Sequence, residues 1–426
     1  MARLTQLGAT AVFAMSGCRS HLASPPEPAC APPGYVEDAK SAFRDIRDRY
    51  VYFAEKSVDW PRAESLATDA ARGSGSKREL VGVLEGALDN LYDAHAIVRA
   101  NTSHSPRLVP SGLDVWAQWI DSVAIITAVR PGYGAERTGV RPGMQVVAIN
   151  GVPIRAAAAA RLGLGVKAPA PPDAMAWALL SALAGRHDTP RILRVRDESA
   201  TTRDIGVDSV ASDLIDREKS EPPVEARWIN AGSGDSAKRY GYIRLNALGD
   251  SSSVPAFDSA LSTFREAAGL ILDLRNTPGG GNTSVAEPIL GRFVTGTRGY
   301  QRVVPRNGAA YTRAVSARGQ WQYKGPLIVL VGRWTGSMGE GMAIGLDGMH
   351  RGVVVGTPMA GLPGAVDDFK LPCSGLGIAF PTARLLHLDG TPRERWVPPV
   401  LGDPHAGDDG ALQRALEILG RPRIPI

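Results

Sequence analysis

The second half of the chain alternates apolar strand patterns with helical patterns, and this alternation limits the possible folds more than any other feature. Four short runs predict buried strands: Tyr240–Leu245, Leu270–Leu274, Leu327–Val331 and Val353–Val355. Phe257, Leu261 and Phe264 would share one face of a helix between the first two runs. Strands that alternate with helices favour an α/β layer structure with much parallel sheet. We therefore predict an α/β core over residues 225–426 that ends in a helix over 411–419.

Residues 35–105 are predicted to form a helical segment in front of this core. Five residues at spacings of seven, three, four and three would lie on one face of a first helix: Val36, Phe43, Ile46, Tyr50 and Phe53. Four leucines predict a second helix: Leu80, Leu84, Leu88 and Leu91. The second helix should end near residues 92–93, so that His95 follows just beyond its last turn.

Residues 106–210 are predicted to be a separate, mainly β module. Val123–Ile126 and Val146–Ile149 predict strands, and the Asn-Gly pair at 150–151 is typical of a two-residue hairpin turn. The segment around this turn resembles the corresponding part of PDZ domains, with Met144 where Asp is usual. Alanine-rich stretches at 156–160 and 174–183 predict helical insertions that a compact PDZ domain does not need.

The resemblance to PDZ domains implies that this module binds peptides. Such domains add a peptide strand to a sheet edge and hold its C-terminal carboxylate on backbone amides. The candidate carboxylate loop contains Gly112 and Leu113. The alternative is a PDZ-like fold that serves only as a spacer.

The first 34 residues are predicted to export and tether the protein. A short apolar run over 7–15, preceded by Arg3, is typical of a signal peptide. The Ser-Gly-Cys sequence that follows resembles the lipobox of bacterial lipoproteins and implies lipid on Cys18, whereas an ordinary cleaved signal is the alternative. The proline-rich stretch after it is typical of a tether. Because Arg19 does not resemble the Asp of inner-membrane retention, we expect a periplasmic protein anchored in the outer membrane.

Charge, histidine spacing and cysteine content argue against several other classes. The 48 basic and 43 acidic residues are scattered, so we expect a solvated surface and no nucleic-acid partner. The histidines form no HExxH motif or ligand-spaced cluster, so we expect neither a metal nor another cofactor. No internal stretch approaches the roughly 18 apolar residues of a membrane span, which leaves the lipid anchor as the only expected membrane contact. If Cys18 is lipidated, Cys30 and Cys373 remain and could pair.

A serine between a buried strand and a helix is the strongest candidate for chemistry. The apolar run that ends at Val331 continues into a turn of small residues, and a helix is expected to begin after Ser337. At that place the unpaired amides and the positive end of the helix dipole favour an alkoxide or oxyanion, as in strand–turn–helix nucleophile motifs. The alternative is that Ser337 only caps the helix, as serine often does.

A glycine-rich turn follows the predicted strand Leu270–Leu274. Gly279 and Gly280 carry no side chain, so their backbone amides could approach a substrate carbonyl oxygen. Phosphate binding is a competing use of such a turn, but the run matches neither the P-loop pattern nor the dinucleotide-binding pattern. Together with the Met338 amide, these two glycines form the predicted oxyanion hole.

The serine turn and the glycine-rich turn together resemble the C-terminal-processing, or tail-specific, serine proteases. The family patterns LilDLR-NpGG and TaS-aE correspond to residues 270–280 and 335–340, and Ser337 follows Gly280 by 57 residues. The resemblance covers nearly the whole chain from Val36 and implies a crotonase-like (ClpP/crotonase-type) layered core. The best-known members use a lysine as base, but Leu362 stands at its position and Lys370 is out of register.

A tricorn-like branch of the same family uses a histidine and a glutamate instead. Residues 91–96 resemble the turn that carries the histidine, and 390–399 resemble the segment that carries the glutamate, which implies a triad of Ser337, His95 and Glu394. His95 would then transfer the proton, while Glu394 would hold the imidazole tautomer and stabilise the imidazolium. His387, near Glu394 in sequence, is the one rival base.

We therefore expect a serine endopeptidase that cleaves envelope proteins or C-terminally exposed segments. One alternative is an inactive relic that binds peptides or apolar ligands, since the lysine is missing and Ala94 replaces a serine of the tricorn-like motif. Another is a crotonase-like enzyme acting on thioesters, in which the PDZ-like insert and the Ser337 turn have no place. We interpret Asp93 as a turn or cap residue and Glu340 as a partner of the helix dipole.

Overall fold

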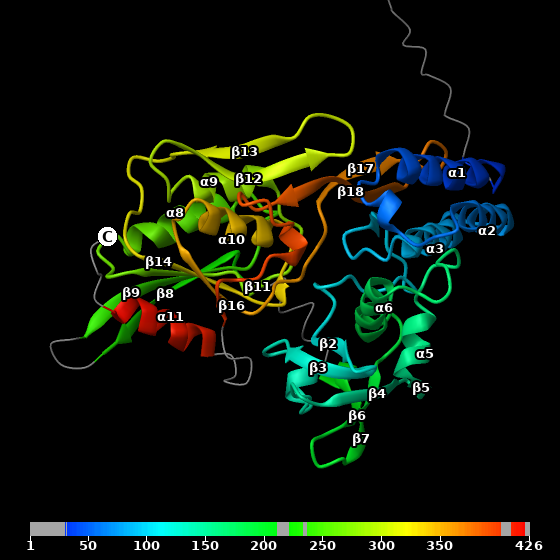
Figure 1. The fold of residues 1–426 in the computed structure, drawn as a ribbon, viewed down its shortest axis with the longest axis horizontal. Coiled ribbons are helices and arrows are strands. Elements are labelled where there is room, and N and C mark those ends of the chain that lie inside the picture. The colour runs from blue at the N-terminus through cyan, green and yellow to red at the C-terminus, as the bar shows by residue number, and fades with distance from the viewer. Residues whose placement is uncertain (1–29, 31, 211–220, 233–236, 402–409, 422–426) are drawn as a thin grey trace, which may run out of the picture.

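Figure 1 shows the computed structural model, which describes residues 30, 32–210, 221–232, 237–401 and 410–421. An α/β core, a group of N-terminal helices and a β-rich module are distinct parts of the ribbon. The predicted signal peptide and the lipidation site Cys18 lie outside the described residues. Within the described ranges, no helix combines the length and the apolar character needed to cross a membrane.

The core is built on a six-stranded sheet, as the alternating sequence pattern predicts. Its order is β19–β16–β14–β10–β9–β8, and all neighbours are parallel except β8 and β9. The bounds are β8 (Val224–Ala231), β9 (Lys238–Leu245), β10 (Leu270–Asp273), β14 (Leu327–Val331), β16 (Val353–Gly356) and β19 (Val400–Leu401). β10 and β14 are buried along their whole length, which is typical of central strands in a sheet covered on both faces.

Helices cover both faces of this sheet. Three helices share one apolar cluster with Leu272: α8 (Ser253–Thr263), α9 (Thr283–Leu290) and α10 (Met338–Gly348). On the other face α11 (Gly410–Gly420) packs against Ile271. Neighbouring residues of a strand point to opposite faces of the sheet, so Leu272 packs against the first group of helices and Ile271 against α11. The strands and helices predicted for the core are thus confirmed.

A second sheet joins the core to the N-terminal helices. Its order is β1–β18–β12–β13, with β17 also paired to β18, and all pairs are antiparallel. The bounds are β1 (Ile97–Val98), β12 (Thr297–Pro305), β13 (Tyr311–Ser316), β17 (Ala365–Lys370) and β18 (Gly377–Leu386). Because β1 begins two residues after His95 and pairs with β18, this sheet fixes where the N-terminal segment meets the core.

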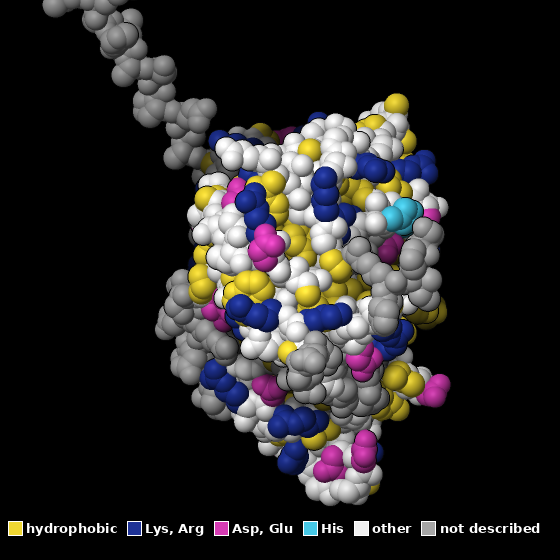
Figure 2. Space-filling view, turned by 90° about the vertical axis from the view of Figure 1, so that its left-hand side faces the viewer, with side chains coloured by type: hydrophobic (Ala, Val, Ile, Leu, Met, Phe, Trp, Pro, Cys, Tyr) yellow, Lys and Arg dark blue, Asp and Glu magenta, His cyan; other side chains and the backbone are white. Residues whose placement is uncertain are grey.

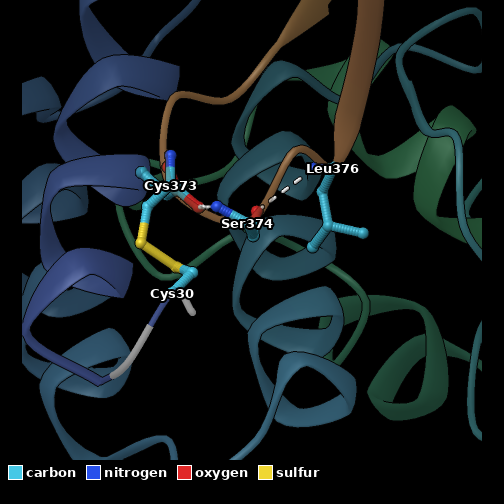
Figure 3. The surroundings of a disulfide bond; sticks show 5 residues. Cys30, Cys373, Ser374 and Leu376 are labelled. Atoms are coloured by element: carbon cyan, nitrogen blue, oxygen red, sulfur yellow. Dashed lines mark hydrogen bonds between the residues drawn. A yellow bond between two sulfur atoms is a disulfide. The ribbon is translucent and has the colours of Figure 1, made fainter. Parts of the chain in front are cut away.

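Three helices precede β1: α1 (Pro32–Arg49), α2 (Trp60–Gly73) and α3 (Lys77–Leu88). α1 begins inside the stretch predicted as a tether, because proline is well accepted in the first turn of a helix. Cys30, just before α1, forms a disulfide with Cys373 in the turn after β17 (Figure 3). The Asp38 carboxylate of α1 accepts the Cys373 backbone N–H in the same place (2.8 Å). These contacts hold α1 to the β17–β18 turn.

The β-rich module contains the predicted hairpin turn and both predicted helices. Its strands are antiparallel in the order β2–β3–β4–β6–β7, with β5 beside β4. Their bounds are β2 (Val115–Ile120), β3 (Val123–Val129), β4 (Gln145–Ile149), β5 (Val152–Pro153), β6 (Ile192–Arg196) and β7 (Thr202–Gly206). Asn150 and Gly151 have φ of 50° and 79°, the left-handed values of a type I′ turn. α5 (Ile154–Ala159) and α6 (Pro172–Ala184) lie where helices are predicted.

The surface shows mixed charge. On the face seen in Figure 2, Lys and Arg side chains are dispersed among acidic and apolar ones and form no continuous stripe. The described residues contain no group of three His, Cys, Asp or Glu side chains that could hold a metal ion. The absence of a nucleic-acid partner and of a metal remains a prediction.

Candidate active site

The turn that carries Ser337 is shaped by the close approach of two loops. β11 (Asn276–Thr277) and β15 (Trp334–Thr335) pair in parallel, just beyond the ends of β10 and β14. A Cβ on Gly336 would lie 2.3 Å from the carbonyl oxygen of Pro278, so only glycine fits at this position. Ser337 follows with φ of 52°, a left-handed value that is rare outside glycine. Such local strain is concentrated at functional turns.

The glycine-rich turn lies against the same serine. Gly279 and Gly280 have φ of 146° and 71°, and a Cβ on Gly279 would lie 4.0 Å from the Cβ of Ser337. Met338 is the first residue of α10, where a helix leaves backbone N–H groups without an intrahelical acceptor. The three residues of the predicted oxyanion hole are therefore brought together around Ser337.

His95 lies within hydrogen-bonding distance of Ser337, although 242 residues separate them in the chain. The His95 Nε2 atom is 3.1 Å from Ser337 Oγ. The Nδ1 atom is 2.8 Å from the carbonyl oxygen of Pro363, which can only accept, so Nδ1 carries the proton. Nε2 is then free to accept the serine proton, which is what a general base requires.

The turn that presents His95 is held by Asp93. Its carboxylate accepts the His95 backbone N–H (2.8 Å) and the Tyr50 hydroxyl (2.7 Å), as expected for a residue that stabilises a turn. Tyr92 has φ of 31°, which reverses the chain after the helical segment ends. Burial, together with the nearby Arg393 cation, lowers the pKa of His95 to about 4. The imidazole is therefore neutral at neutral pH.

Glu394 lies in the same region, but the Pro363 carbonyl occupies the place at Nδ1 that the triad model assigns to an acid. Glu394 Oε1 accepts the Tyr52 hydroxyl instead (3.0 Å). Its buried Oε2 has no hydrogen-bond partner in the described part of the chain. A buried carboxylate oxygen without a donor is unfavourable, so this atom remains an available acceptor.

Glu340 has a larger structural role than the predicted one. Its buried carboxylate accepts three backbone N–H groups, from Ser337 (2.7 Å), Gly361 (2.9 Å) and Leu362 (3.2 Å). It therefore joins the serine turn to the loop that presents the Pro363 carbonyl. Burial raises the pKa of Glu340 to about 7 in spite of these donors. The spacing of Ser337 and Glu340 is a capping-box pattern, which could have predicted the first of the three bonds.

Arg393 is a site residue to which the sequence interpretation gave no role. Its buried side chain donates to the carbonyl oxygens of Ser337 (3.1 Å), Leu362 (2.9 Å) and Gly364 (2.8 Å). It thus contacts the same two segments as Glu340, whose pKa it lowers. Sequence patterns carry no signal for an arginine whose partners are carbonyl groups of distant loops.

Three other positions were considered for the base: Leu362, Lys370 and His387. None of them has a described hydrogen bond to Ser337. Leu362, at the lysine position, is buried, and its Cδ1 atom would be 3.3 Å from a Cβ on Gly336. An apolar group therefore fills the place beside the serine turn. Lys370 is exposed at the last position of β17. His387 accepts the Asp389 backbone N–H at Nδ1 (3.2 Å) and has no described bond to Ser337.

The expected carboxylate loop of the β-rich module differs from the prediction. The Gly112 N–H donates to the Leu108 carbonyl (2.6 Å), and the Leu113 N–H donates to the Pro110 carbonyl (3.1 Å). Leu113 is buried, and its own carbonyl accepts the Trp334 indole N–H (2.6 Å). This turn closes on itself and packs against the core, so neither amide is offered to a ligand.

Family comparison agrees with the geometry around Ser337. Residues 239–399 match the model of Peptidase family S41. This segment is thus similar to the peptidase domain of that family. It contains Ser337, Glu340, Arg393 and Glu394, whereas His95 is supplied by the helical segment that precedes it.

Relatives and solved structures extend the match beyond this segment. The chain is 22% identical over 318 residues to the chloroplastic C-terminal processing peptidase of Tetradesmus obliquus, covering 72% of this chain and 62% of the relative. It is 27% identical over 317 residues to the carboxyl-terminal-processing protease of Picosynechococcus sp., covering 72% and 67%. The chain thus spans less than two thirds of the algal relative.

Two solved structures share the fold over most of the chain. Mature CPAF matches with a TM-score of 0.59 and 16% identity, covering 91% of this chain and 96% of that one. The photosystem II D1 C-terminal processing protease matches with a TM-score of 0.57 and 20% identity, covering 91% and 97%. The N-terminal helices and the β-rich module therefore belong to the shared architecture.

Proposed function

We propose that the chain is a serine endopeptidase in which Ser337 is the nucleophile, His95 the general base and acid, and Glu394 the acid of the site. The main support is the 3.1 Å distance between His95 Nε2 and Ser337 Oγ, with the Nδ1 proton bonded to Pro363. The S41 match of residues 239–399 supports the same activity. Its substrates would be protein or peptide chains.

The reaction follows from these positions. Ser337 Oγ attacks the carbonyl carbon of the scissile peptide bond, and its proton passes to His95 Nε2. The N–H groups of Met338, Gly279 and Gly280 stabilise the oxyanion, and each such donor is worth about 3–4 kcal/mol in comparable sites. His95 then protonates the leaving amine as the C–N bond breaks. A water that gives its proton to neutral His95 hydrolyses the acyl-enzyme and restores Ser337.

Glu394 would act through its charge and not as the group that holds the tautomer. Pro363 already holds the Nδ1 proton, and Arg393 disfavours a positive charge on the ring. The imidazolium formed during attack therefore needs a negative counter-charge nearby. Glu394, oriented by the Tyr52 hydroxyl and with one free buried oxygen, supplies it.

The finer architecture belongs to the same proposal. We infer a crotonase-like peptidase core over 225–426, a PDZ-like module over 106–210 and a helical segment over 35–105 that supplies His95. The parallel core sheet with its strand–turn–helix serine supports the first assignment. The antiparallel module with its type I′ hairpin supports the second.

The location rests on the sequence alone. A lipid on Cys18 would anchor the protein in the outer membrane, with the proline-rich stretch holding the catalytic body away from the bilayer. The substrates would then be envelope proteins or C-terminally exposed segments. Metabolic labelling with a palmitate analogue tests the anchor, and a soluble, unlabelled mature protein would contradict it.

An active-site serine reagent tests the catalytic proposal directly. A fluorophosphonate should label the purified protein at Ser337, and the protein should cleave casein. Ser337→Ala should abolish both, while Ser284→Ala, at an exposed serine of α9, should leave both unchanged. Labelling that survives Ser337→Ala would exclude this nucleophile. A wild-type protein that is neither labelled nor active would instead indicate the peptide-binding relic.

A further inference from the structure

A cleft of about 800 Å³ lies where the core meets the β-rich module. Its walls are the ends of three parallel core strands, at 273–276, 331–334 and 356–357, and the module segment 127–142. In parallel α/β sheets, ligands bind beyond the carboxyl ends of the strands, which is where this cleft lies. Ser337 and His95 do not line it, but its Arg333–Trp334 wall precedes Ser337 by only a few residues.

The lining of the cleft is positively charged. Six arginines and three acidic residues contribute to it. The acidic groups already have partners: Asp273 pairs with Arg275 (2.6 Å), Glu136 accepts the Gly132 N–H (2.6 Å), and Glu221 lies 4.0 Å from Arg244. The lining therefore contains three more arginine side chains than acidic ones.

Arg333 makes one weak polar contact with the described residues. It is half-buried, its guanidinium lies 5.2 Å from the centre of the Trp116 ring, and Nη1 makes one long bond to the Met359 carbonyl (3.4 Å). Among the described residues no carboxylate pairs with it. Burial lowers the pKa of Arg333 to about 10, so the group is still charged at neutral pH. A charged group removed from water without an anion favours binding of one.

We propose that this cleft binds a carboxylate of a peptide chain through Arg333 and so anchors the substrate of the peptidase. This inference rests on the proposed function. A carboxylate can give the guanidinium the two parallel, charge-assisted hydrogen bonds that its present neighbours do not provide. The carboxylate could come from the C-terminus of the peptide or from an Asp or Glu side chain, and the experiment below separates the two sources.

The position of Arg333 suits such an anchor. Ser337 is the fourth residue after Arg333, so their Cα atoms lie at most about 14 Å apart. An extended peptide advances about 3.3 Å per residue. A carboxylate held by Arg333 would therefore place a peptide bond about four to six residues away at Ser337, once the length of the arginine side chain is included. Met359, which Arg333 contacts, also belongs to the loop between β16 and β17, which contains Pro363.

Binding to inactive protein tests the anchor separately from catalysis. Three short fluorescein-labelled peptides of one Ala/Val/Ser sequence are titrated into Ser337→Ala protein: one with a free C-terminus, one amidated, and one amidated with an internal Glu. We expect the free acid to bind roughly ten- to hundredfold more tightly than the amide. Equal tightness of the amidated Glu peptide would identify a side chain as a sufficient source. No preference for either carboxylate would overturn the proposal.

Variants then assign the preference to Arg333. Arg333→Met in the Ser337→Ala background should reduce the ratio of the two dissociation constants to about one, whereas Arg302→Met, at an exposed arginine of β12, should retain it. If Arg333→Met does not fold, Arg333→Lys is the second variant. Lysine keeps the positive charge but cannot form two parallel hydrogen bonds to a carboxylate, so the preference for the free acid over the amide should still weaken. A preference that survives these changes would overturn the assignment. A wild-type protein without peptidase activity would refute the proposed function alone, since binding is measured without catalysis.

Discussion

The serine and histidine sides of the proposed catalytic pair are built in different ways. The serine side is local: β14, β15 and the start of α10 place Gly336, Ser337 and Glu340 within one short stretch of chain. The histidine side is assembled from distant segments, because the His95 ring depends on the Pro363 carbonyl and its backbone on Asp93. A change on the serine side therefore disturbs backbone geometry, whereas a change on the histidine side mainly alters the protonation of one ring.

Glu340 and Arg393 connect the two sides. Each contacts the serine turn and the loop that contains Pro363: Glu340 accepts backbone N–H groups, and Arg393 donates to carbonyl groups. The His95 ring, the proposed base, is thus held by the same loop that is bonded to Glu340 of the serine side. Loss of this connection should disturb both the serine turn and the His95 ring. The variants below distinguish its effect from the effect of a change on one side alone.

The largest effect is expected from the base itself. His95→Ala should lower kcat by about 10⁴-fold or more, because no other described group can take the Ser337 proton. The melting temperature should change less than the activity, since the described hydrogen bonds of the ring are those to Pro363 and Ser337. Casein cleavage and thermal melts measure the two effects, with His104→Ala at an exposed position as the control. Activity that survives His95→Ala but is lost in Lys370→Ala would assign the base to a lysine.

The pH dependence of kcat/KM tests whether the His95 side or the serine side limits activity. His95 has a lowered pKa of about 4, so it is neutral above that pH, and kcat/KM should fall as the pH drops through about 4. Glu340, with a raised pKa of about 7, changes charge in a different range. A fall in kcat/KM near pH 7 that disappears in Glu340→Gln would show that the serine side, and not the base, controls the profile.

Glu340→Gln should have an intermediate effect on activity and a clear effect on stability. The amide offers one acceptor oxygen and turns an NH2 group toward backbone N–H groups that need acceptors. We expect the free energy of unfolding to fall by about 2–3 kcal/mol, and kcat to fall less than in His95→Ala. Urea denaturation measures the stability and casein cleavage the activity, and Glu417→Gln, at an exposed position of α11, serves as the control. Unchanged stability would show that the three bonds contribute little.

The smallest loss of kcat is expected for a change at Glu394. Because Pro363 already holds the Nδ1 proton, Glu394→Gln should lower kcat only about tenfold, through the lost charge near the imidazolium. Tyr52→Phe should have a similar or smaller effect, and the double variant should show less than the sum of the two. Single-turnover kinetics on the four proteins test this. A loss of about 10⁴-fold in Glu394→Gln would mean that the acid holds the tautomer after all.

Much of the core and of the serine side could be predicted from the sequence. The apolar run at 327–331, the small residues after it and the spacing of Ser337 and Glu340 are signals that act over a few residues. The same holds for the Asn-Gly hairpin at 150–151, whose left-handed conformation these residue types accept readily. Burial periodicity and turn chemistry are local properties, so they can be recognised along the chain.

The histidine side could be predicted only in part. The family resemblance pointed to His95, and the structure brings it to Ser337, but the group at Nδ1 is a backbone carbonyl. Any residue type carries such a carbonyl, so the sequence has no signal for it. The same reason applies to Arg393, which binds three carbonyl groups, and to the amides of Gly112 and Leu113, which bond within their own turn.

What the sequence determined by itself is which elements form and which residue types are available for chemistry. Only the tertiary structure decided which of them share a site, because that depends on how loops far apart in the chain pack. Pro363 reaches His95 across 268 residues, and Tyr52 reaches Glu394 across 342. Whether two polar groups bond depends on their distance and direction. Both are set by the second sheet, which joins the N-terminal helices to the core.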